Sequence, residues 1–115
     1  MQTIVEKIEL FKTIGMLDEA GYEIMNRWVK LLEENQLAES EKLEVLITHC
    51  VCMMSRASQN ENIDELPQEL MEQIQKNIHY EQSLKILQKM EAIHQIEAKE
   101  RSYVLLHLCN CMEER

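Results

Sequence analysis

The sequence of 115 residues contains only two glycines and one proline. These residues mark turns, so their scarcity argues against an all-β fold and against long flexible linkers. Leu, Ile, Met, Glu, Gln and Lys are abundant instead, and all of them are accommodated well in helices. The length is typical of one domain and is sufficient to close a single hydrophobic core. The composition therefore predicts a single all-α domain.

Positive charge is scarce as well, because 12 Lys and Arg residues stand against 21 Asp and Glu residues, giving a net charge of −9. A chain this acidic repels phosphate backbones, so direct binding to DNA or RNA is not expected. The sequence lacks an uninterrupted apolar stretch long enough to cross a bilayer. Its first residues soon become charged, unlike a signal peptide. We therefore expect a cytoplasmic protein that does not bind membranes.

Hydrophobic periodicity predicts six helices and no internal domain boundary. Gly15 is placed to end the first helix, and Asp18 and Ser40 are placed to cap the second and third. Pro67 suits the first turn of the fourth. We expect residues 1–17 to form an N-terminal helix and turn, and residues 18–115 to form the remaining bundle. The predicted helices are residues 2–14, 19–35, 41–58, 67–77, 80–96 and 98–114.

The third predicted helix is apolar on more than one side. One face is its core stripe, and His49 lies on a nearly opposite face together with Val45, Cys52 and Arg56. A helix of this kind is either central in the fold or part of an oligomer interface. The predicted core stripe consists of Leu43, Leu46, Ile47, Cys50, Met54 and Ala57.

The sixth predicted helix carries a second histidine outside its apolar stripe. Glu100, Tyr103 and His107 share one row, so His107 is expected to point away from the core among polar neighbours that can orient its ring. An accessible neutral imidazole can accept a phosphoryl group, because a ring nitrogen is the nucleophile. A single histidine on a helix surface usually has no function, and the interpretation that His49 and His107 have none stays open. His79 and His94 lie near segment ends.

Two motifs around these histidines resemble a known family. The run Leu43-x-x-Leu-Ile-x-His49-x-x-x-Met-x-x-Arg56 is similar to the first histidine helix of the PTS regulation domain, or PRD. The run Glu97-Ala-Lys-Glu100-Arg-Ser-Tyr103-Val-Leu-Leu-His107-Leu is similar to its second. The resemblance covers about residues 18–114. The chain has one such module and an additional N-terminal helix, so it resembles a stand-alone single-PRD protein.

The resemblance implies a compact bundle of five helices, often dimeric, in addition to the N-terminal helix. It also implies a regulatory domain, not an enzyme, that needs no cofactor. Phosphotransferase-system proteins such as the phosphocarrier HPr or an EIIB component would phosphorylate histidine and so control carbohydrate-utilisation genes or proteins through dimer or partner contacts. By residue, His49 and His107 are the candidate phosphoacceptors, and Arg56, Glu100 and Tyr103 are the supporting side chains.

Three other interpretations remain open. Residues two apart on a helix diverge by about 200°, so neither Cys-x-Cys pair can chelate one ion while helical. A mixed metal site of His49, Cys52, His107 and Cys111 has better spacing, because pairs three and four apart share a face. A helical adaptor or dimerisation protein without phosphorylation is also compatible with the sequence. Hydrolytic or transferase catalysis ranks last, because the chain has none of the common catalytic motifs and its carboxylates follow solvated faces.

Overall fold

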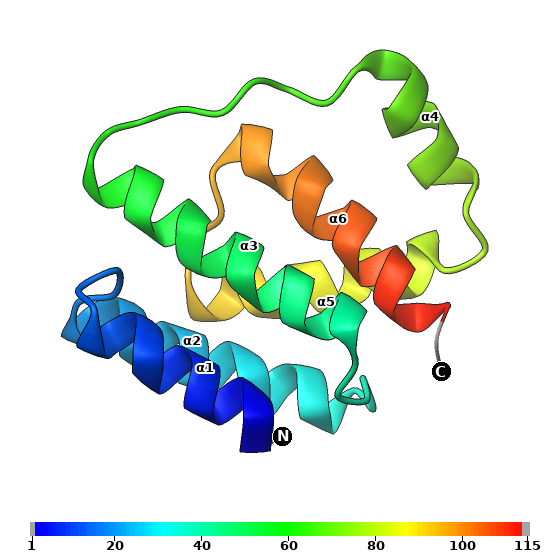
Figure 1. Ribbon diagram of the computed structural model, residues 1–115. Coiled ribbons are helices and arrows are strands. Elements are labelled where there is room, and N and C mark those ends of the chain that lie inside the picture. Colours follow the sequence, from blue (N-terminus) through cyan, green and yellow to red (C-terminus); the bar gives the residue numbers. More distant parts are fainter. Residues whose placement is uncertain (1, 114–115) are drawn as a thin grey trace.

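The computed structural model describes residues 2–113, and within them it contains six α-helices and no strand. The all-helical prediction is therefore confirmed. Helix α3 runs through the middle of the molecule, with α1 and α2 on one side and α6 on the other (Figure 1). The helices are α1 (Gln2–Thr13), α2 (Glu19–Glu34), α3 (Glu41–Ser58), α4 (Gln68–Lys76), α5 (Tyr80–Ile93) and α6 (Ala98–Met112).

The helix ends follow the predicted local signals. Gly15 adopts a φ of +88° after α1, a conformation that glycine takes without the steric cost of a side chain. The Asp18 carboxylate accepts a hydrogen bond of 2.7 Å from the Gly21 N–H at the start of α2. The Ser40 hydroxyl accepts one of 3.2 Å from the Leu43 N–H at the start of α3. These bonds satisfy backbone donors that a helix start leaves free.

Some predicted boundaries are displaced by extended backbone. Helix α5 ends at Ile93, not at residue 96, because His94 is extended with φ −157° and ψ 130°. Ile96 is buried all the same, in the connection to α6. Pro67 precedes α4 as its cap, one position earlier than predicted, since its ψ of 143° is not helical. Glu114, the predicted end of the last helix, lies outside the described residues.

The core is built mainly from the inner faces of α2, α3, α5 and α6, and α1 closes one side of it with Ile4 and Ile8. Trp28 is fully buried, and its indole N–H donates to the backbone carbonyl of Met90 at 2.9 Å, joining α2 to α5. A buried indole usually needs such a partner. This bond leaves the polar end of the largest core side chain satisfied.

The predicted core stripe of α3 is wrong at two positions. Ala57 is exposed and Met54 is only half-buried, whereas Val51 and Met53 are buried. Helix α3 contacts α1 and α2 on one side and α6 on the other, so its buried surface is wider than a single stripe. Its two apolar sides are explained by this central position.

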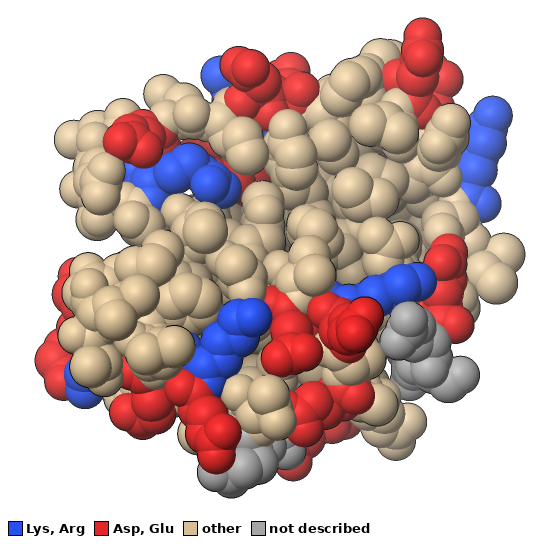
Figure 2. All heavy atoms as spheres, viewed as in Figure 1, with Lys and Arg blue, Asp and Glu red and all other residues tan. Residues whose placement is uncertain are grey.

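Acidic side chains outnumber basic ones on the surface. Figure 2 shows Asp and Glu side chains gathered along the lower part and the upper edge of the face drawn, with fewer Lys and Arg among them, as the net charge of −9 implies. Within the described part of the chain, no helix has both the length and the apolar character needed to cross a membrane.

Candidate functional site

Helices α3 and α6 bring the two singled-out histidines together. The ring centroids of His49 and His107 are 5.0 Å apart, with an interplanar angle of 46°. The ring of Tyr103 stacks on His49 from the other helix, at 5.6 Å and 19°. His107 is half-buried against His49, so the prediction that it points away from the core into polar surroundings is only partly right. Its row on α6 faces α3, not open solvent.

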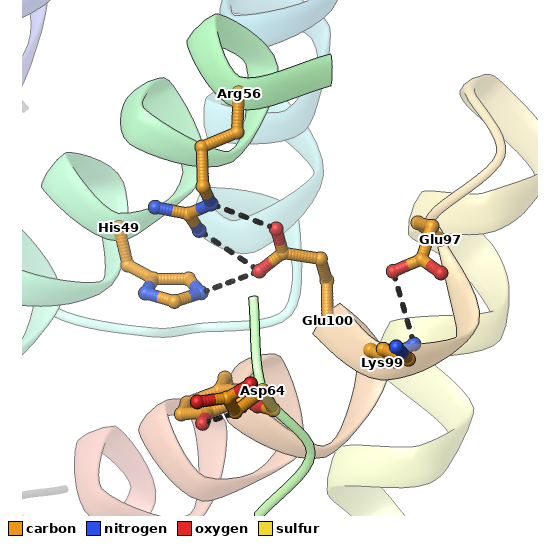
Figure 3. Close-up of polar contacts among 7 residues, drawn as sticks. His49, Arg56, Asp64, Glu97, Lys99 and Glu100 are labelled. Carbon is orange, nitrogen blue, oxygen red and sulfur yellow. Dashed lines mark hydrogen bonds and ion pairs between the residues drawn. The ribbon is translucent and has the colours of Figure 1, made fainter. Parts of the chain in front are cut away.

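Glu100 is the buried charge of this cluster, with only 4% of its surface exposed. Arg56 donates two hydrogen bonds to its carboxylate, Nε to Oε2 at 3.0 Å and Nη2 to Oε1 at 2.9 Å. Figure 3 shows Arg56 and His49, both from α3, directed at this carboxylate from α6. The expectation that carboxylates follow solvated faces is therefore wrong for Glu100. Its burial is tolerated because the guanidinium pairs with it in a two-pronged arrangement.

His49 directs one ring nitrogen at the same carboxylate without bonding to it. Its Nε2 atom lies 3.5 Å from Glu100 Oε1 but is buried and has no hydrogen-bond partner among the described residues. Burial lowers the pKa of His49, the Glu100 carboxylate partly opposes this, and Arg56 adds to the lowering. The imidazole is therefore neutral at pH 7, and the contact is not a full ion pair there.

His107 is also kept neutral. Burial, together with any positive charge on His49, lowers the pKa of His107 to about 4. Two neutral imidazoles thus face each other, and a neutral ring retains the nitrogen lone pair that a nucleophile needs.

Tyr103 has a second contact that the sequence did not suggest. Its hydroxyl donates a hydrogen bond of 2.7 Å to the backbone carbonyl of Asp64, in the long connection between α3 and α4. The residue whose ring stacks on His49 therefore also ties this connection to the first half of α6. Nothing local in the sequence marks Asp64 as its partner.

A surface hollow of about 560 Å³ opens beside the histidine pair. The two rings share it with a side chain of α1 and with side chains of the first half of α3, and among these the sequence analysis placed only Val45 on the face of His49. The signal for them lay in the packing of α1 on α3, which periodicity alone does not reveal. The hollow is lined by Lys7, Glu41, Glu44, Val45, Thr48, His49 and His107.

The four cysteines are not joined in disulfides. Cys50, Cys109 and Cys111 are buried and Cys52 is half-buried. Burial raises the pKa of the Cys50 thiol to about 12 and also raises that of Cys109, so both are protonated and poor ligands or nucleophiles at pH 7. Within residues 2–113, no group of three or more His, Cys, Asp or Glu side chains is arranged to hold a metal ion. The mixed His–Cys site is not assembled.

A separate cavity of about 600 Å³ lies between the start of α2, the end of α3 and the α5–α6 connection. Its wall includes apolar side chains such as Ile24 and Met53, and also Glu100. Neither His49 nor His107 lines it. Glu100 thus stands between this cavity and the histidine pair.

Comparison with known proteins gives one family. The model of the PRD domain matches residues 22–110, which take in α3 to α5 completely and most of α2 and α6. No curated protein and no solved structure matches the chain. The matched region contains both histidines together with Arg56, Glu100 and Tyr103, and it leaves α1 outside. The chain therefore belongs to the PRD domain family, a family of regulatory domains that respond to the phosphotransferase system.

Proposed function

We propose that this protein is a regulatory module switched by phosphorylation of its paired histidines, His49 and His107. The observation that carries the proposal is their arrangement: two neutral imidazoles, 5.0 Å apart between centroids, line one surface hollow. A family of regulatory domains supports the same reading. The donor is a phosphotransferase-system protein such as HPr or an EIIB component, and the regulated process is carbohydrate utilisation.

The reaction at either ring is a simple transfer. The lone pair of a neutral imidazole nitrogen attacks the phosphorus atom of a donor phosphohistidine or phosphocysteine. The bond from phosphorus to the donor nitrogen or sulfur breaks, and its electron pair returns to the donor. Buried Nε2 of His49 is closed to a donor in this conformation, so attack on His49 requires its other nitrogen or a rotated ring. The protein is the substrate of this transfer and contributes no further catalytic group.

Arg56 and Glu100 connect the acceptor to the rest of the fold. A phosphoryl group adds roughly −1.5 to −2 charge and several strong acceptor oxygens. On His49 it competes with Glu100 for the Arg56 guanidinium, whose two bonds join α3 to α6. A change in this ion pair alters how α3 and α6 pack. The affinity of a dimer or partner contact made through these helices then changes with it.

Intact mass spectrometry tests the proposal. The native chain is incubated with enzyme I, HPr and phosphoenolpyruvate beside the double variant His49→Ala/His107→Ala. We expect phosphorylation of the native chain and none of the double variant. The variant His79→Ala/His94→Ala, which removes the other two histidines, is the matched control and should be phosphorylated normally. An unmodified native chain, beside an authentic PRD that is modified, would favour a helical adaptor that ignores phosphodonors.

A further inference from the structure

We propose that His49 and His107 form a single-occupancy site that holds one phosphoryl group per chain, and that Lys7 of α1 is the cation that stabilises it. The inference rests on the function proposed above. It starts from two facts: the rings are in contact, and both line the same hollow, which α1 borders with Lys7. Each ring is therefore within reach of a donor docked over that hollow.

Charge limits the hollow to one phosphoryl group. Glu41 and Glu44 line it, so two carboxylates already outnumber the single ammonium of Lys7. Arg56, whose positive charge acts on His49 from the same helix, is committed to Glu100 through two hydrogen bonds. One phosphoryl group deepens the negative potential, and a second on the neighbouring ring would be placed against a charge of roughly −2 at close range. Occupation of one histidine thus opposes occupation of the other.

Lys7 is available to offset the first charge. Its ammonium has no ion pair and no hydrogen bond with the described residues, and its side chain is half-buried. The buried neighbours Ile4 and Ile8 fix its helix on the core, and the Ile4 N–H donates to the Glu39 carboxylate at 3.0 Å. Helix α1 lies outside the matched PRD region of residues 22–110. Helix α1 therefore contributes, from outside the matched region, a lysine that lines the same hollow as the acceptor pair.

The first experiment counts phosphoryl groups. The native chain is labelled with excess enzyme I, HPr and phosphoenolpyruvate until its intact mass no longer changes, and the single variants His49→Gln and His107→Gln are treated in the same way. We expect one group on the native chain and one on each variant, with the doubly modified native species at least roughly tenfold less abundant. Two groups on the native chain would overturn single occupancy. One variant that stays unmodified would also overturn it, since the limit would then reflect a single reactive histidine. A native chain without any label counts against the proposed function itself.

The second experiment tests Lys7. We expect Lys7→Gln to slow labelling roughly tenfold and Lys7→Arg to restore most of the rate, because one charge-assisted contact to the phosphoryl group is lost and regained. Lys85→Gln, an exposed lysine of α5, is the control and should label like the native chain. Thermal unfolding midpoints of the three variants should agree, which separates a charge effect from a folding defect. An unchanged labelling rate in Lys7→Gln would show that Lys7 does not stabilise the phosphoryl group.

Discussion

Among single side chains, His107 has the most strongly altered titration in the site. Its ordinary pKa near 6.5 is lowered to about 4 by burial and by His49, and the pKa of His49 is lowered in the same direction. Both rings therefore resist protonation in the folded chain and accept protons readily once unfolded. Between pH 4 and 6.5 the unfolded state binds more protons, so the free energy of unfolding falls as the pH drops through this window.

The variant His107→Gln removes part of this pH dependence. From pH 7 to pH 5 we expect the native chain to lose about 1 kcal/mol more unfolding free energy than the variant, a figure reduced because His107 is only half-buried. Urea unfolding at the two pH values, followed by circular dichroism, gives the difference. His79→Gln, in the turn between α4 and α5, is the control and should behave as the native chain does. Equal losses in the native chain and in His107→Gln would contradict the lowered pKa.

At the scale of one helix, α1 is part of the core although it lies outside the matched family region. Ile4 and Ile8 are fully buried on its inner side, while Leu10 and Ile14 are more than half exposed. Burying an isoleucine side chain contributes about 2 kcal/mol through removal of apolar surface from water. The helix is therefore held by its inner side, and this is what keeps Lys7 beside the histidines.

Two truncations within α1 test this. We expect Ile8→Ala to lower the free energy of unfolding by about 2 to 4 kcal/mol, because it leaves a cavity between α1 and the helices beneath it. Leu10→Ala, two residues along the same helix with 57% of its surface exposed, should change it by less than about 0.5 kcal/mol. Urea denaturation of both variants measures the contrast. Two small and similar effects would mean that α1 is not anchored by its inner face.

Local sequence signals were sufficient to predict the helices but not the contacts that make up the site. Gly15, Asp18 and Ser40 act within a few residues of themselves, so their capping roles were visible in the sequence. Glu100 was misplaced because its burial depends on Arg56, which lies 44 positions away on another helix. Likewise, both histidines were singled out from motifs, but their contact depends on how α3 packs against α6. No pattern within one helix encodes that distance.

At the scale of the whole molecule, the net charge of −9 sets the expected response to phosphorylation. A homodimer remains a prediction for this chain. Each added phosphoryl group increases repulsion between two acidic copies, and the increase is largest at low ionic strength, where charges are least screened.

We therefore expect phosphorylation to weaken self-association by roughly tenfold at low salt and by less at high salt. Sedimentation velocity of labelled and unlabelled protein at several concentrations measures the dissociation constant. The variant His49→Ala/His107→Ala, treated with the same donors, controls for effects of the labelling mixture. A dissociation constant that is the same before and after labelling would show that dimerisation is not the output of the switch.

Trp28 offers a built-in optical probe for such work. It is the only tryptophan of the chain, it is fully buried, and its indole N–H is bonded to the Met90 carbonyl between α2 and α5. Its fluorescence in the folded chain should be shifted to short wavelength and should move to longer wavelength when water reaches the core. Since the ring is not part of the histidine pair, its emission reports the integrity of the bundle separately from events at the acceptor. A labelling experiment can thus carry its own check on folding, in the same cuvette and without an added dye.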